Sequence, residues 1–252
     1  MKNKILKKIA VSVAVFLIWI LVWWICAAIV FNKYGDNYFL PSPLDTLLAL
    51  LTLLSEASFY KVVFASLLRV IAGLSIGVAL GSALAFICHR IDFLRSLFNP
   101  AISVLKAMPV ATFILLLWIT LKGSTLTVLI GVIMVLPIIF QNLLSGLDSI
   151  DKDLMEVTRI YGFSFIKKMK ILVLPSLRSY LFPAIITSVG LAFKSQIAAE
   201  IIAYTNNSIG GYIYDANYAL KTDEVFAWAA VIVIFSIGLE TVCKKLLGRV
   251  KK

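Results

Sequence analysis

Long apolar runs alternate with short polar segments along nearly the whole chain. Each run has about 20 residues or more and few charges, which predicts a membrane-spanning helix because about 20 apolar residues cross a bilayer. The predicted spans cover residues 9–31, 62–88, 97–121, 125–147, 177–202 and 225–247. We therefore predict an all-α polytopic membrane protein in which residues 1–252 form a single transmembrane domain of about six helices.

Two of these runs carry features that bear on packing. The run 62–88 has Gly73, Gly77 and Gly81 at every fourth position, and such a stripe of small residues lets helices approach closely. The run 97–121 is interrupted by Lys106 and by Met108 with the proline that follows it. Proline removes a backbone donor, so we expect an interruption of the helix there.

Between the first two spans, the segment 40–43 reads Leu-Pro-Ser-Pro. Ser42 is a favoured N-cap residue, and Pro43 suits the first helical position because its missing N–H has no helical partner there. Leucines follow on one face of the predicted helix. We expect an amphipathic helix that lies along the outer membrane surface.

The stretch 148–175 is the most polar long segment of the chain, with nine charges. Each charge would cost about 2.5–3.5 kcal/mol at a bilayer centre, so this segment faces water. Its apolar residues recur at helical spacing and therefore lie on one face of a helix. They are Ile150, Leu154, Val157 and Tyr161. Ser149 or Asp151 is predicted to cap this helix, Gly162 to end it, and Ser164 to cap a second short helix. The pattern predicts a docking element whose apolar face needs a partner.

Composition and charge restrict the class of protein further. The chain is 61% hydrophobic and 15% charged, with a formal net charge of +11. Most basic residues fall in a few short loops, so the charge does not indicate nucleic-acid binding. One set of loops, which includes both termini and the 148–175 stretch, holds seventeen basic residues, and the other set holds four. The positive-inside rule then places both termini and this stretch in the cytoplasm.

The sequence shows no catalytic triad, paired-carboxylate site, phosphate-binding loop or zinc pattern. We therefore expect no enzymatic activity, no metal and no cofactor bound by this chain. Cys26, Cys88 and Cys243 lie within or at the ends of apolar runs and have no disulfide or metal-site spacing. His89 is interpreted as a loop residue without a partner.

The 148–175 stretch resembles the cytoplasmic coupling loop of ABC importer permeases, which reads Glu-Ala-Ala, three residues, Gly, nine residues, Ile, one residue, Leu-Pro. Glu156, Gly162, Leu174 and Pro175 occupy the Glu, Gly, Leu and Pro positions with the same spacing. Val and Thr replace the two alanines, and Leu172 replaces the isoleucine. The resemblance implies that the contact with an ATPase is made by Glu156, Val157, Thr158, Arg159, Tyr161, Gly162, Leu174 and Pro175.

Further motifs extend the resemblance over nearly the whole chain, to the nitrate, sulfonate and taurine branch of these permeases. They are Leu-Pro-Ser-Pro at 40–43, Ser-Leu-Leu-Arg-Val-Ile-Ala-Gly at 66–73, Asn-Pro at 99–100, Met-Pro at 108–109, Ala-Glu-Ile at 199–201, Gly-Gly-Tyr-Ile at 210–213 and Lys-Thr-Asp at 221–223.

The resemblance implies a type I importer permease in the bacterial inner membrane. Its partners would be ATPase subunits that bind the ATP, an extracytoplasmic solute-binding protein and a second permease chain, as a homodimer. The implied solute is a nitrate-, sulfonate- or taurine-like anion or a related small organic compound.

Polar residues within the spans are candidates for the translocation path, because ionisable groups in a membrane usually face a bundle interior or a watery cavity. These candidates are Arg69, Lys106, Lys194, Gln196 and Glu200. In one interpretation, the three cations attract an anion. In the other, Arg69 and Lys106 extend to the interface or pair internally, for instance with Glu200.

Two other functional classes remain open from the sequence. A self-contained secondary transporter or channel would need no ATPase and would show inverted repeats and broken spans at the midplane. A membrane scaffold that anchors an ATPase would need no hydrophilic path. The predicted docking loop argues against the first of these alternatives, and solute uptake would exclude the second.

Overall fold

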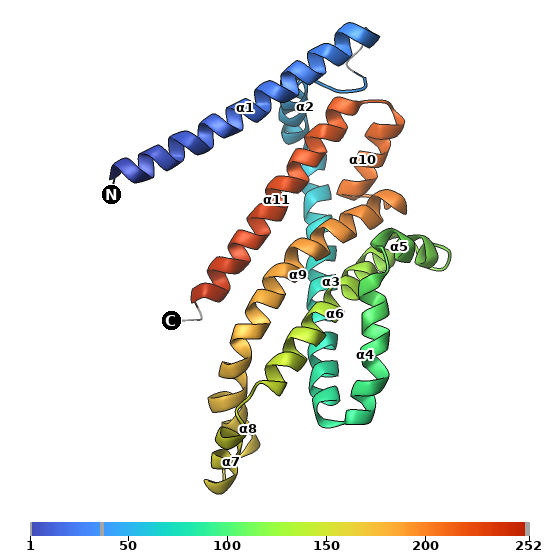
Figure 1. Cartoon of the computed structure of the whole chain (residues 1–252). Helices are drawn as coiled ribbons and strands as arrows, with labels where there is room; N and C mark the ends of the chain where they lie inside the picture. Colours follow the sequence, from blue (N-terminus) through green and yellow to red (C-terminus); the bar gives the residue numbers. More distant parts are fainter. Residues whose placement is uncertain (1, 36–37, 250–252) are drawn as a thin grey trace. The chain divides into compact units, whose positions relative to one another are not determined.

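The structure is a computed structural model that describes residues 2–35 and 38–249, and every regular element in these ranges is a helix. Figure 1 shows their course along the chain. The helices are α1 (Lys2–Tyr34), α2 (Pro43–Ser55), α3 (Ala57–Arg90), α4 (Asp92–Ala107), α5 (Val110–Trp118), α6 (Gly123–Asp148), α7 (Lys152–Ile160), α8 (Phe165–Lys168), a π turn (Met169–Val173), α9 (Leu174–Ile202), α10 (Ile209–Tyr218) and α11 (Thr222–Arg249).

Within the described residues, five helical segments are long and apolar enough to cross a membrane. They are parts or all of α1, α3, α6 and α11, together with the continuous run Phe165–Ile202 that contains α9. Counting α4 and α5 together as one broken span brings the number to six. The predicted all-α polytopic fold is confirmed.

The apolar run 97–121 is divided between two helices, and the structure shows where it breaks. Helix α4 already begins at Asp92, and α5 leaves its end at an angle of 98° (Figure 1). Met108 and Pro109, at the break, are both extended, with ψ values of 135° and 136°. A residue before proline avoids helical geometry, and proline has no N–H to continue the helix. The predicted interruption is therefore a sharp bend, so residues 97–121 do not form one straight helix.

The chain divides into two compact units, of which the first comprises Met1–Val62 and Tyr212–Ile232. Trp228 is buried there, and its indole lies 5.3 Å from the ring of Phe59 and 5.7 Å from that of Tyr212, centroid to centroid. Ser42 caps α2 as predicted, and with Asp45 it forms a capping box in which each side chain accepts a backbone N–H. These contacts order the segment that leads into α2.

The second unit comprises Val63–Gly211 and Val233–Lys252, and its core lies along α6 and α9. Ile139, Phe140 and Leu177 are buried in this core. The predicted close approach of the α3 glycines is confirmed: a Cβ atom at Gly77 would lie 2.7 Å from Val135 Cβ, and one at Gly81 would lie 2.8 Å from the Leu136 carbonyl oxygen. Both contacts are with α6, so the small residues let α3 pack directly on its backbone.

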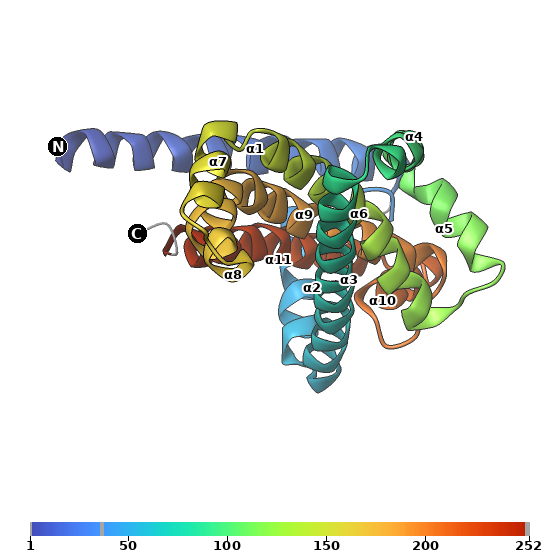
Figure 2. The same cartoon turned by 90° about the horizontal axis from the view of Figure 1, so that it is seen from below.

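Helices α7 and α8 of the 148–175 loop lie at one end of the second unit, in the foreground when it is viewed from below (Figure 2). The predicted second short helix, capped by Ser164, is only the start of a continuous helical run that extends from Phe165 through α9 to Ile202. The π turn in this run ends at Val173, two residues before Pro175, whose ring would otherwise crowd the carbonyl of Ile171. The wider turn lets the proline sit inside an unbroken run.

Candidate functional site

The helix α7 is closed at both ends by its own residues. Asp151 accepts the N–H of Asp153 at 2.8 Å and caps the start, as one of the two sequence alternatives predicted. At the other end Gly162 has φ of +60°, which only glycine adopts freely. The N–H of Phe163 donates to the Thr158 carbonyl at 2.9 Å, and that of Gly162 donates to the Arg159 carbonyl at 3.1 Å. This pair of bonds is a Schellman motif, which fixes the bend after α7.

Four apolar side chains of α7 and of the residue after it are exposed in the isolated chain, whereas Ile150, which was predicted for the same face, packs against the core. Leu154 and Val157 are half exposed, and Ile160 and Tyr161 are each 74% exposed. Among the predicted ATPase-contact residues, Thr158 is the exception, because its side chain is buried and its hydroxyl donates to the Met155 carbonyl. An apolar helix face next to water is typical of a surface that another protein covers.

The remaining predicted contact residues lie in two places. Glu156 and Arg159 line a hollow of about 450 Å³ beside α7, together with Phe163 and Lys168. Leu174 and Pro175 lie farther along the chain, exposed in the first turn of α9. The structure therefore gathers the α7 residues at one surface and leaves Leu174 and Pro175 at the base of the following helix.

Three charged or titratable side chains meet where α6 ends and the loop begins. Asp148 accepts from Arg95 at 2.6 and 3.3 Å and lies 3.0 Å from His89 Nδ1. The interpretation of His89 as a loop residue without a partner was wrong: it is in the last turn of α3 and contacts a carboxylate 59 residues away. This contact arises only from the packing of α3 against α6, so no local sequence pattern indicates it. The cluster connects α3, α4 and α6 directly before α7.

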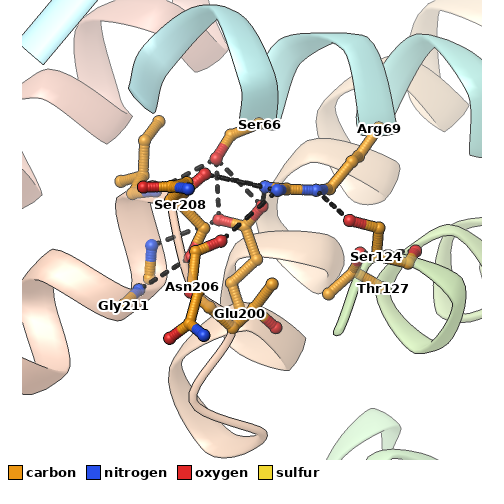
Figure 3. Close-up of polar contacts among 12 residues, drawn as sticks. Ser66, Arg69, Ser124, Thr127, Glu200, Asn206, Ser208 and Gly211 are labelled. Carbon is orange, nitrogen blue, oxygen red and sulfur yellow. Dashed lines mark hydrogen bonds and ion pairs between the residues drawn. The ribbon is translucent and has the colours of Figure 1, made fainter. Parts of the chain in front are cut away.

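A second polar network joins α3 to the C-terminal end of α9 (Figure 3). Arg69 Nη1 lies 3.0 Å from Glu200 Oε1, and the Glu200 side chain is only 1% exposed. Ser66, one turn before Arg69, donates to the same carboxylate at 2.9 Å. Arg69 Nε also donates to Ser124 Oγ of α6 at 2.9 Å. This is the internal pairing that one interpretation of the sequence allowed for Arg69.

The same network holds the segment after α9. The N–H of Gly210 donates to Glu200 Oε2 at 3.1 Å, and the N–H of Ile209 donates to Ser66 Oγ at 3.0 Å. The guanidinium of Arg69 also donates to the backbone carbonyl of Asn207, at 3.2 and 3.3 Å. Glu200 thus accepts one N–H of the first turn of α10, that of Gly210, at a helix end where the dipole favours an anion. The network fixes the 203–211 connection to α3.

Gln196 is fully buried between two glycine-lined helices. Its side chain lies against Gly73 of α3 and Gly131 of α6, where any Cβ would collide with the amide. With its nitrogen turned toward α3 and α6, the amide donates to the carbonyls of Arg69 at 2.9 Å and of Thr127 at 3.3 Å. Gln196 therefore contacts three helices and lies one turn from Glu200.

The other two cations predicted for the translocation path lie apart from this network. Lys106, at the end of α4, donates to the Gln141 side-chain oxygen of α6. Lys194 is exposed on α9 and lines a groove with residues of α11. The structure therefore brings Arg69, Gln196 and Glu200 together and separates Lys106 and Lys194 from them.

Comparison with known proteins identifies the family. The profile described as "Binding-protein-dependent transport system inner membrane component" matches residues 77–243, which is more than half of the chain. The chain belongs to this family of ABC importer permeases. The matched range includes the α7 loop and the α6–α9 core, so the permease fold and the predicted coupling loop fall within the family region.

The permease is similar to curated proteins over almost its full length. It is 23% identical over 250 residues to the taurine transport system permease protein TauC of Escherichia coli (strain K12), covering 96% of this chain and 89% of TauC. It is 25% identical over 241 residues to the nitrate import permease protein NrtB of Synechocystis sp., covering 91% of this chain and 83% of NrtB.

A solved structure shares the fold of the permease. It is the crystal structure of a bacterial ABC transporter involved in the import of the acidic polysaccharide alginate, with a TM-score of 0.61. The match covers 99% of both chains at 15% sequence identity, which is evidence for the fold alone.

Family membership settles the coarse role of the permease. It is a multi-pass inner-membrane transport component and not a catalytic subunit. Transporters of this family work with a solute-binding protein and with a separate ATPase subunit that hydrolyses the ATP. Family membership therefore favours an ATP-driven importer over a self-contained secondary transporter or channel.

Proposed function

We propose that this permease imports a small anionic or zwitterionic solute of the taurine, sulfonate or nitrate type, and that α7 couples its movement to ATP hydrolysis. The observation that carries the coupling role is the exposed apolar face of α7, which ends in a fixed bend within the family region. The solute class is supported by the names of the relatives, a taurine permease and a nitrate permease. The contact with the ATPase comprises Glu156, Val157, Thr158, Arg159, Tyr161, Gly162, Leu174 and Pro175.

Reconstitution tests this function directly. The permease, its ATPase and its binding protein are placed in vesicles, and uptake of radiolabelled taurine and of nitrate is measured with and without ATP. We expect uptake of at least one solute that requires both ATP and the binding protein. Uptake driven by an ion gradient without ATP would favour a secondary transporter. ATPase binding without uptake of any member of a wider solute panel would favour a scaffold.

The proposed topology has spans at 9–31, 62–88, 97–121, 125–147, 177–202 and 225–247, with both termini in the cytoplasm. Its support is the excess of basic residues in one set of loops. In intact cells, a membrane-impermeant thiol reagent should label Asn207→Cys and should not label Lys168→Cys. Permeabilised cells provide the control, because both cysteines should react there. Labelling of Lys168→Cys in intact cells would overturn this orientation.

We also propose that two copies of this chain form one transporter, since a single bundle of this size offers one α7 face for one ATPase. Differently tagged copies should copurify from cells that also express the ATPase. A heterodimer with another permease predicts the opposite: tagged copies of this chain would not copurify, although each would still bind ATPase.

A further inference from the structure

A groove of about 590 Å³ lies between α9 and the C-terminal part of α11. Its polar lining comprises Thr187 and Lys194 of α9 and Glu240 and Lys244 of α11. All of these residues belong to the second compact unit and to helices that are apolar and long enough to span a membrane. The volume lies within the range of small-molecule sites. Ionisable residues at such positions are costly and usually mark a solute or ion pathway.

The groove has a specific geometry around Gly190. A Cβ atom at this position would overlap Oε1 of Glu240, so the carboxylate lies directly against the backbone of α9. Glu240 therefore points toward α9 and the groove, and glycine at 190 leaves the space that it occupies. Lys244 Nζ lies 3.8 Å from the other oxygen, Oε2, one helical turn away on α11.

The charges of the groove do not balance. Lys244 accompanies Glu240, whereas no carboxylate of residues 2–35 and 38–249 lies within ion-pair distance of Lys194. Two lysines and one glutamate give the lining a net charge of +1. The remaining positive charge is that of Lys194, which is exposed to the groove.

The other two span cations are already engaged by polar groups: Arg69 by a carboxylate, and Lys106 by a neutral amide that leaves its charge unneutralised. The guanidinium of Arg69 pairs with the buried Glu200 carboxylate and with backbone carbonyls. Lys106 donates to the side-chain oxygen of Gln141. Of the three cations first considered for an anion path, Lys194 is the one that combines an unpaired charge with a cavity large enough for a solute.

We infer that the α9–α11 groove binds the anionic group of the transported solute at Lys194 and favours monoanionic groups over dianionic ones. The hydroxyl of Thr187, on the same wall, supplies a hydrogen-bond donor. Glu240 supplies the selectivity, because its fixed negative charge repels a second negative charge on the ligand. This inference rests on the proposed function, of which it specifies the solute chemistry and the binding residues.

Protection of an engineered thiol tests the site without knowledge of the natural solute. Leu191 lines the same groove and is partly exposed, so Leu191→Cys places a thiol there. The background replaces the native Cys26, Cys88 and Cys243, and the labelled sample is the purified permease–ATPase complex. The measurement is the rate of reaction with an uncharged maleimide in methanesulfonate, nitrate or sulfate at equal ionic strength.

We expect methanesulfonate or nitrate to slow labelling at least threefold and sulfate to have little effect. Lys194→Gln should abolish this protection, whereas Lys194→Arg, which keeps the charge, should retain it. Glu240→Gln should let sulfate protect as well, because the repelling charge is gone. Equal protection in the Lys194→Gln complex, no protection by either monoanion, or a thiol that never reacts would each overturn the inference.

A lipid phosphate is the other possible source of an anionic group at this groove. The labelling rate is therefore also compared in nanodiscs of phosphatidylcholine and of phosphatidylglycerol. Slowing by phosphatidylglycerol, without slowing by soluble monoanions, would assign the groove to a lipid headgroup and overturn the inference. If protection fails while the ATPase still copurifies and solute uptake persists, only the groove assignment is wrong. If ATP-dependent uptake is also absent, the proposed function fails independently.

Discussion

Replacing Gly162 with Val is expected to uncouple the permease from its ATPase. Gly162 has φ of +60°, a conformation that costs an L-residue about 1–2 kcal/mol and a β-branched residue more. A Cβ atom there would meet nothing within 4 Å, so the penalty is conformational and not steric crowding. Relief of this strain breaks the Schellman hydrogen bonds. The apolar face of α7 then points in a different direction. ATPase affinity should fall by about tenfold or more, as about 1.4 kcal/mol corresponds to a factor of ten.

The measurement is copurification of the ATPase together with ATP-dependent uptake, both normalised to the amount of membrane-inserted permease. Gly238→Val is the matched control, because its position also has open space but no positive φ. Gly162→Asn is the conservative variant, since asparagine tolerates the left-handed region better than other residues. Glu156→Lys should reduce docking as well, by reversing an exposed charge at the same surface. Normal uptake by Gly162→Val at wild-type expression would show that the bend has no part in coupling.

Replacing Arg69 with Leu is expected to destabilise the chain strongly. It leaves the Glu200 carboxylate, which is 1% exposed, without its cation, although Ser66 and Gly210 still donate to it. Removing one partner of a buried ion pair costs about 3–5 kcal/mol. At roughly 2–4 °C per kcal/mol for a chain of this size, Tm should fall by about 6–20 °C. The measurement is thermal unfolding of the purified permease in detergent.

Replacing Glu200, the other partner of the ion pair, should cost less stability than Arg69→Leu. This difference tests the energetic coupling of the pair more directly. Glu200→Gln keeps the shape of the side chain, and Arg69 retains the Asn207 carbonyl, Ser124 and a side-chain exposure of 13% to water. The double variant, Arg69→Leu with Glu200→Gln, should be more stable than Arg69→Leu alone because no charge is left buried. Equal losses for the two single variants, or a double variant whose loss is their sum, would contradict an energetic coupling between these residues.

The sequence by itself determined the features that depend on local patterns. Apolar runs fix which segments can enter a membrane, because span length depends only on bilayer thickness. Capping residues such as Ser42 and Asp151 act over a few positions, so both were recognisable, although Ser149 remained an alternative for the second. The positive φ of Gly162 followed from the same local reasoning. The α7 loop could be located and given a role because its spacing is local and matches its family.

Only the tertiary structure decided which polar groups meet, since those contacts join positions far apart in the chain. Arg69 and Glu200 are 131 residues apart, and His89 and Asp148 are 59 apart. The packing of α3 on α6 and α9 sets both contacts. The glycine period of α3 marks a face that packs closely, but it does not identify the helix that packs there. The same holds for Glu240 at Gly190, where a carboxylate on one helix requires a missing side chain on another. Charge in a span marks a residue as important, but its partner depends on how the helices cross.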